Sequence, residues 1–171
     1  AALAGDEKDA LLRFALQRIG GKVPVMIGTG TNNYMQSLAN TKKAEELGAD
    51  SALVITPYYI KPTQNGMYEY FKSIAAKVKI PIVIYNVPGR TGVNMAAETT
   101  LRLARECPNI IGIKEASGNL VQATNILKGA SDDFSLMSGE DALNLPLMAI
   151  GAKGCISVTA NVAPRLMSDH I

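Results

Sequence analysis

Short apolar runs rich in β-branched residues alternate along the chain with longer segments whose apolar positions recur at helical spacing. Each run is apolar throughout, as strands buried on both faces of a parallel sheet are, and a polar or glycine-bearing loop follows it. The predicted strands are residues 23–27, 52–56, 82–87, 110–114, 134–137 and 155–159. The predicted helices are residues 6–19, 33–47, 66–77, 96–106, 120–127 and 142–150, and another helical pattern begins in residues 162–171.

Strict alternation of strand and helix predicts an α/β fold made of βαβ units with right-handed crossovers. An open doubly wound sheet and a (β/α)₈ barrel both fit this order, but a full barrel needs about 250 residues and eight strands. Six predicted strands in 171 residues are two too few. Because the first element is a helix and the last pattern breaks off at the end, we expect the chain to be part of a longer one.

Composition narrows the class of protein. A hydrophobic content of 47% supplies the core of one domain, residues 1–171. The 17 basic and 15 acidic residues are interspersed, so no basic stripe indicates nucleic acid. No apolar stretch approaches the ~20 residues of a membrane helix, and the N-terminus lacks the pattern of a secretory signal. We expect a cytoplasmic protein that binds neither nucleic acid nor membrane.

Few residues are available for metal or histidine chemistry. Cys107 and Cys155 lack the spacing of a metal or disulfide framework and fit a reducing compartment. The one histidine, His170, stands beside the chain end, which argues against a Ser/His/Asp triad, a Cys/His pair and a histidine-rich metal site. A carboxylate-only magnesium site stays open, but structural or solvated roles suit the acidic residues better, so we expect no metal.

Lys114 ends the apolar run of residues 110–113. An amine carried out of a buried strand into a semi-enclosed pocket loses hydration in its charged form, which lowers its pKa and yields a neutral nucleophile. Such a lysine can form a Schiff base with a ketone. The alternative is a solvated lysine, or one paired with Glu115.

Candidate partners follow the neighbouring strands. Tyr85, near the end of the preceding strand, can donate and accept a proton. Arg90, on a glycine-flanked loop, offers the planar fork that binds a carboxylate at two points. Tyr58 and Tyr59 follow strand 52–56, on the side where a barrel carries its active-site loops, and function and packing explain them equally well.

Glycines mark the other strand ends. Gly28 and Gly30 resemble a dinucleotide-binding loop, but the third glycine is absent, so a strand-to-helix turn capped by Asn33 is the better explanation. Gly139 would let a ligand approach the backbone closely, and Ile156 could wall a pocket.

Three motifs occur in order along the chain: Thr-Pro-Tyr-Tyr at residues 56–59, Tyr-Asn-Val-Pro-Gly-Arg-Thr-Gly at 85–92, and Gly-Ile-Lys-Glu-Ala-Ser-Gly at 112–118. Through them the chain closely resembles the dihydrodipicolinate synthase family over its whole length. The resemblance implies a (β/α)₈ TIM barrel of which this chain holds strands three to eight, without the first two strands and the C-terminal helices.

The resemblance also implies a lyase that condenses pyruvate with L-aspartate-4-semialdehyde to 4-hydroxy-tetrahydrodipicolinate in lysine and diaminopimelate biosynthesis. No cofactor is implied, and the family is usually a homotetramer. Lys114 would form the Schiff base, Tyr85 would transfer protons and Arg90 would hold the semialdehyde carboxylate. The remaining implied roles belong to Tyr59, which would reach a neighbouring subunit's site, and to Gly139 and Ile156, which would contact pyruvate through their backbones.

Two departures from the family matter. Its Gly-Thr-Thr-Gly-Glu motif, whose threonine joins two tyrosines in a proton relay, would precede Ala1, so we expect the chain as written to be catalytically incomplete. The lysine feedback site of some members would use Tyr58, Gly30, Asn32 and a glutamate where Gln36 stands. Without that carboxylate the amino groups of lysine lack a charged partner, which argues against feedback inhibition.

Two other functions remain open. A sister Schiff-base lyase, such as N-acetylneuraminate lyase or a keto-deoxy-sugar aldolase, shares the lysine, but Arg90 argues against it because those enzymes typically place another residue there to receive a polyol. A non-catalytic barrel fragment kept for assembly with partner chains is the second, because missing strands would expose sheet edges and apolar helix faces.

Overall fold

A computed structural model describes residues 3–19 and 21–171 of the chain. The strands are β1 (Met26–Gly28), β2 (Ser51–Ile55), β3 (Ile82–Asn86), β4 (Ile110–Glu115), β5 (Ser135–Ser138) and β6 (Gly154–Cys155). The α-helices are α1 (Gly5–Ile19), α2 (Tyr34–Glu46), α3 (Gln64–Ala75), α4 (Pro88–Thr91), α5 (Ala97–Glu106), α6 (Leu120–Gly129), α7 (Asn144–Ala149) and α8 (Pro164–His170). Two short 3₁₀ helices, η1 (Asp141–Leu143) and η2 (Thr159–Asn161), complete the described elements.

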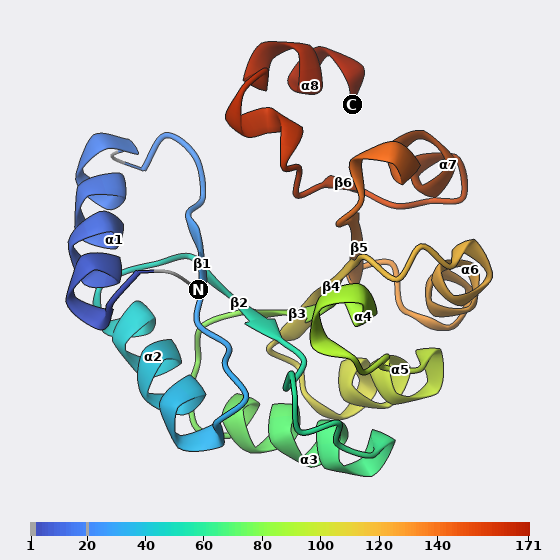
Figure 1. Cartoon of the computed structure of the whole chain (residues 1–171), viewed down its shortest axis with the longest axis horizontal. Coiled ribbons are helices and arrows are strands. Elements are labelled where there is room, and N and C mark those ends of the chain that lie inside the picture. Colours follow the sequence, from blue (N-terminus) through green and yellow to red (C-terminus); the bar gives the residue numbers. More distant parts are fainter. Residues whose placement is uncertain (1–2, 20) are drawn as a thin grey trace.

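The six strands form one parallel sheet in the order β1-β2-β3-β4-β5-β6. A doubly wound sheet reverses its strand order at a switch point, whereas a barrel adds each new strand beside the last. The sequential order therefore identifies an incomplete (β/α)₈ barrel, as the family resemblance implied. Figure 1 shows the strands at the centre and helices α1, α2, α3, α5, α6 and α7 along a curved arc outside them, with α4 near the strand ends and an open side between α1 and α8.

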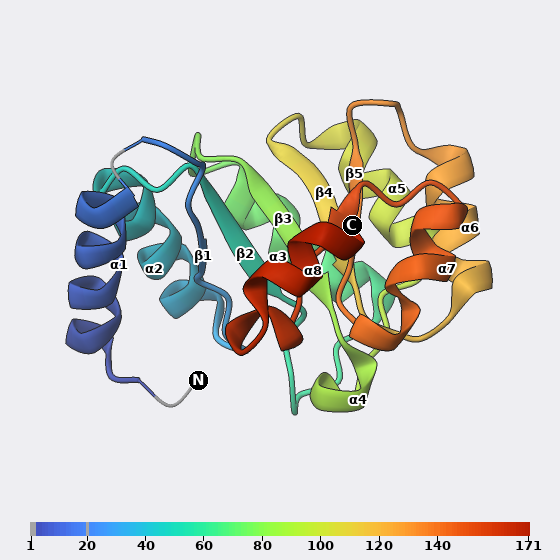
Figure 2. The same cartoon turned by 90° about the horizontal axis from the view of Figure 1, so that it is seen from above.

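The two faces of the sheet differ in burial. Alternate residues of a strand point to the same side of the sheet, and those that face the helices are inaccessible to solvent. These residues are Ala52, Val54, Ile82, Ile84, Ile113 and Leu136, and they pack in the main core with Met67, Phe71, Ile74, Leu103 and Ile126. The other set lines the concave face, where Leu53, Ile55 and Tyr85 are half-buried and Val83 and Lys114 are buried. Figure 2 shows the strands and the helices around them from above.

Several sequence-based assignments were wrong in detail. The strand predicted at 23–27 is Met26–Gly28. The strand predicted at 155–159 is only Gly154–Cys155, because the backbone N–H groups of Val158 and Thr159 donate to the Asp141 carboxylate at 3.1 and 2.8 Å instead of pairing in the sheet. The helix predicted at 142–150 is divided into η1 and α7. Pro146 lacks an N–H and cannot bond the carbonyl four residues earlier. The single turn α4 was not predicted.

Within residues 3–19 and 21–171, no helix combines the length and the hydrophobicity that a membrane crossing requires.

Candidate active site

Lys114 and Tyr85 lie side by side on the concave face of the sheet. The β3–β4 register pairs these two residues directly, one residue before each strand ends, so both side chains point to the same side. The Lys114 Nζ lies 4.2 Å from the centroid of the Tyr85 ring, within range of a cation–π contact. Lys114 is only 8% exposed. A titratable amine is thus enclosed next to a phenol at the carboxyl end of a central strand.

The surroundings of Lys114 favour its neutral form. Burial lowers the pKa of the amine from its ordinary 10.5, while the negative charge of Asp141 acts in the opposite direction. Pairing with Glu115, the alternative considered from sequence, is wrong. Adjacent strand residues point to opposite faces, and the Glu115 carboxylate bonds Asn86 and Gln122 behind the sheet. Lys114 therefore faces the concave side without that carboxylate.

Tyr85 is held as a neutral phenol. Burial raises the pKa of its hydroxyl above 10.0, the positive charge of Arg90 lowers it and the negative charge of Glu140 raises it. Arg90 lies in α4, a single turn that begins with Pro88 and ends at Gly92 in the left-handed conformation, φ +73°. The Arg90 side chain is exposed, and its charge acts on Tyr85.

Gly139 leaves the space through which the Lys114 side chain passes. A Cβ on Gly139 would lie 2.9 Å from the Lys114 Cε, 3.0 Å from its Cγ and 2.8 Å from the Ala116 Cβ. The N–H of Gly139 donates to the Glu115 carbonyl at 2.8 Å, and the N–H of Ile156 donates to the Ser138 carbonyl at 2.8 Å. Both N–H groups are used by the sheet, so any backbone contact from these residues to a ligand must come from their carbonyl oxygens.

Tyr59 stands apart from the Lys114–Tyr85 pair. Its side chain is 86% exposed, and its backbone has φ +72°, which is unusual for a residue with a Cβ. Its N–H donates to the Thr91 carbonyl at 3.3 Å, which ties the loop after β2 to the end of α4. The ring projects outward from a fixed backbone.

The predicted regulatory residues lie together near the N-terminus of α2. Asn32, Gln36 and Tyr58 line one hollow of about 500 Å³. Gly30 lies beside it, and a Cβ there would meet the Ile55 N at 2.3 Å, so the strand-to-helix turn requires glycine for close packing. Asn33 caps α2 by accepting from the Gln36 N–H at 3.0 Å, which confirms the preference for a capped turn over a dinucleotide loop.

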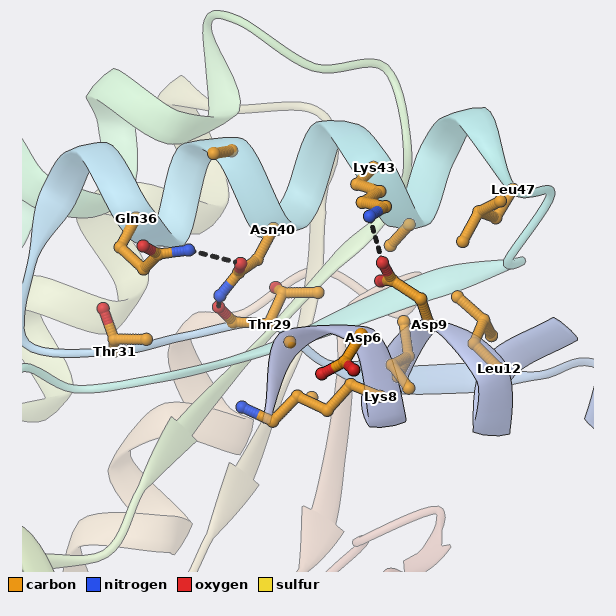
Figure 3. Close-up of a pocket in the computed structure, with 15 residues that line it drawn as sticks. Asp6, Lys8, Asp9, Leu12, Thr29, Thr31, Gln36, Asn40, Lys43 and Leu47 are labelled. Atoms are coloured by element: carbon orange, nitrogen blue, oxygen red, sulfur yellow. Dashed lines mark hydrogen bonds and ion pairs between the residues drawn. The ribbon is translucent and has the colours of Figure 1, made fainter. Parts of the chain in front are cut away.

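A second hollow, of about 620 Å³, separates α1 from α2 at the β1 edge. Figure 3 shows Lys43 of α2 paired with Asp9 of α1, and Gln36 donating to Asn40 at 2.8 Å. Gln36 thus borders both hollows. In the part of the chain that the structure describes, no group of three or more histidine, cysteine or acidic residues is placed to hold a metal ion.

Four polar side chains behind the reactive pair were missed from sequence: Asn86, Asn94, Glu115 and Gln122. Asn86 and Glu115 directly follow Tyr85 and Lys114 and are paired in the sheet register. Buried carboxylates are rare unless hydrogen bonds satisfy them, and Glu115 is 2% exposed. The period-two alternation of a strand was the signal that could have placed Glu115 on the helix side.

Fold and site together define a class: a parallel α/β-barrel protein with a buried lysine at the carboxyl end of a central strand. The model of the dihydrodipicolinate synthetase family matches residues 1–171, and the chain belongs to that family. A 4-hydroxy-tetrahydrodipicolinate synthase of Bacillus subtilis is 48% identical over 169 residues, which are 99% of this chain and 58% of that protein. The chain thus spans less than two thirds of the relative's length.

Two solved structures support the assignment. The dihydrodipicolinate synthase of Aquifex aeolicus matches with a TM-score of 0.95 and 46% identity, covering 98% of this chain and 57% of that one. The chloride-inhibited enzyme of Acinetobacter baumannii, complexed with pyruvate, matches with a TM-score of 0.95 and 42% identity over 98% of this chain and 57% of that one.

Proposed function

We propose that this chain supplies the Schiff-base half of a 4-hydroxy-tetrahydrodipicolinate synthase, which condenses pyruvate with L-aspartate-4-semialdehyde in lysine and diaminopimelate biosynthesis. The observation that carries the proposal is the enclosed Lys114, with its Nζ 4.2 Å from the ring of Tyr85. The names of the relatives supply the substrates, and the pyruvate complex of the Acinetobacter baumannii enzyme supports the first of them.

The chemistry begins with the neutral amine of Lys114. It attacks the ketone carbon of pyruvate, and the resulting carbinolamine loses water to give an iminium ion. Loss of a methyl proton gives an enamine, which forms the new carbon–carbon bond at the aldehyde carbon of the semialdehyde. The amino group of that substrate then attacks the iminium carbon, closes the ring and releases Lys114.

Tyr85 is the proposed proton carrier. Because burial raises the pKa of its hydroxyl, the phenol is protonated at neutral pH and can donate to the carbinolamine oxygen before it takes the proton back. Arg90 binds the semialdehyde carboxylate, and the carbonyl oxygens of Gly139 and Ile156 border the pyruvate. The exposed Tyr59 suits a role across a subunit boundary, as in a homotetramer of the cytoplasm.

Reductive trapping tests the proposal. Borohydride added in the presence of pyruvate should fix a carboxyethyl group on Lys114, detected in the peptide that contains it by mass spectrometry. Lys114→Arg keeps the charge and should give no adduct, while Lys153→Arg, at an exposed lysine, should trap as the unchanged chain does. An adduct spread over several surface lysines, or none at all, would contradict the assignment.

The preferred acceptor aldehyde separates this function from the sister lyases. The protein that carries this chain should turn over aspartate semialdehyde in preference to sialic acid or keto-deoxy sugars. Arg90→Ala should raise KM for the semialdehyde while pyruvate trapping on Lys114 changes far less, because in this scheme Arg90 contacts only the second substrate and affects the pyruvate steps only through the pKa of Tyr85.

A further inference from the structure

Behind the Lys114–Tyr85 pair, four side chains form a closed ring of hydrogen bonds: Asn86, Glu115, Gln122 and Asn94. Asn86 Nδ2 donates to the Glu115 carboxylate oxygens at 3.1 and 3.3 Å, and Gln122 Nε2 donates to Glu115 Oε2 at 3.1 Å. Asn94 Nδ2 donates to Gln122 Oε1 at 2.8 Å, and Asn86 Nδ2 donates to Asn94 Oδ1 at 2.8 Å. The ring joins the ends of β3 and β4 to α6 and to the loop after α4.

The Glu115 carboxylate is the acceptor on which this ring depends. It is 2% exposed and is satisfied by amide groups, including the Ser117 N–H at 2.7 Å. A buried charge is costly to desolvate even when it is fully hydrogen-bonded, and a packed apolar residue would often be at least as stable. Stability alone is therefore a weak reason for a carboxylate here.

Register explains what the ring does. Asn86 and Glu115 are paired directly, one residue beyond the pair Tyr85 and Lys114, and each points to the helix side of the sheet. Asn86 Oδ1 also accepts from the Met95 N–H at 3.0 Å, which fixes the loop that follows the Arg90-bearing turn α4. One carboxylate thereby connects the strand ends that bear the phenol and the amine with the segment that bears the guanidinium.

We infer that Glu115 is a positioning residue: through Asn86 and Gln122 it holds Lys114, Tyr85 and Arg90 in their reactive arrangement. Glu115 itself does not touch substrate. The inference deepens the proposed function and rests on it for its kinetic consequence, whereas its structural consequence, the fixed environment of Lys114, does not depend on any substrate.

Glu115→Gln is the direct perturbation. A glutamine keeps the size but replaces one acceptor oxygen by a donor, so an amide N–H must face another donor at Asn86 and at either Ser117 or Gln122. Displacing reacting groups by about 1 Å can cost on the order of 100-fold in rate, and we expect a loss of that order in pyruvate trapping on Lys114.

Glu45→Gln is the matched control. The Glu45 Oε1 accepts from the backbone N–H groups of Lys79 and Ile80 at 2.7 and 2.9 Å, so it is a carboxylate clamp at the opposite end of β3. Its loss should reduce stability without changing the trapping rate per folded molecule. Equal effects of the two substitutions on trapping would show that Glu115 acts only through stability and would overturn the inference.

A double substitution tests for rescue. Asn86→Asp combined with Glu115→Gln returns one carboxylate and one amide to the pair, and the amides of Gln122 and Asn94 can each turn by half a rotation to reverse the ring. Most of the lost trapping rate should return. A double variant that folds but traps pyruvate more slowly than Glu115→Gln alone would show that disruption of the hydrogen-bond ring does not cause the loss of trapping.

The reactivity of the Lys114 amine provides a second measurement, which needs no pyruvate. Competitive acetylation of Lys114 across pH, followed by mass spectrometry, reports the pKa and reactivity of the amine. Glu115→Gln should shift this profile and Glu45→Gln should not. If the unchanged chain traps no pyruvate, the proposed function fails and the acetylation profile alone decides the inference. If Glu115→Gln leaves the profile unchanged, the inference fails while the proposed function stands.

If Glu115→Gln does not fold, Gln122→Leu tests the positioning role of Glu115 instead. It removes one donor to Glu115 and opens the ring while the carboxylate keeps Asn86 and Ser117. Trapping and acetylation should change in the same direction, by less than expected for Glu115→Gln. A folded Gln122→Leu chain with unchanged values in both measurements would overturn the inference.

Discussion

Adding a single methyl group at Gly139 should displace the reactive lysine. In Gly139→Ala the new Cβ would lie 2.9 Å from the Lys114 Cε and 2.8 Å from the Ala116 Cβ. Carbon atoms in ordinary contact are about 3.5–4.0 Å apart, so one side must move by about 0.5–1 Å. Gly139 is not among the described glycines with positive φ, so the effect is steric and not conformational.

Two magnitudes follow from this overlap. Overpacking of this size costs about 1–3 kcal/mol in the free energy of unfolding. The flexible Lys114 side chain yields more easily than the sheet, and misplacing a reacting group by about 1 Å can lower a rate on the order of 100-fold. We therefore expect pyruvate trapping to fall far more than the stability loss alone explains.

Urea unfolding and borohydride trapping, both run on the same preparations, measure the two effects. Gly28→Ala is the control, because a Cβ at Gly28 has no neighbour within 4 Å and the residue lies in the same sheet. It should change neither quantity appreciably. Trapping by Gly139→Ala at the unaltered rate would refute the view that this glycine makes room for Lys114.

Three further predictions concern charge. Because burial disfavours the charged amine, Lys114 binds its proton less tightly in the folded than in the unfolded chain. The free energy of unfolding should therefore rise with pH between the lowered pKa of folded Lys114 and 10.5. Lys114→Met should abolish this rise, measured by urea unfolding at several pH values. Hydrogen bonds from donors at Thr159 and Ser157 lower the pKa of Asp141 from 3.8 to about 2, so Asp141 should stabilise the fold above pH 3.8 and lose that effect as the pH falls toward 2. Asp141→Asn should lower the stability at neutral pH and remove this loss on the acid side. Free lysine should not raise the melting temperature of the unchanged chain, whereas Gln36→Glu should introduce such a rise in thermal-shift measurements, and its absence would count against a lysine site in that hollow.

Sequence patterns located most of the sheet because parallel strands are buried on both faces and are bounded by polar loops. The positions of Lys114 and Tyr85 could also be predicted from the sequence, because both lie near the ends of predicted strands. The length of β6 could not be predicted, because it depends on Asp141, a side chain from another element that binds the N–H groups of Val158 and Thr159. Such long-range hydrogen bonds leave no local periodic signal.

The α4 turn and the Glu115 ring were missed for different reasons. Pro88 and Gly92 were interpreted as loop residues, although proline at the first position and glycine just past the end are typical of a short helix. The Glu115 ring depends on four side chains far apart in sequence, and only the strand alternation of Glu115 was predictable.

Each strand of the sheet is bonded to its neighbours in sequence. Each pairing therefore spans one βαβ crossover, so the sheet can grow in the order in which a ribosome releases the strands. Tyr85 and Lys114 come from two consecutive strands separated by a single crossover. The pairing of Tyr85 with Lys114 can therefore form before β5 and β6 join the sheet, and Gln122 and Gly139 complete the surroundings of Lys114 only afterwards.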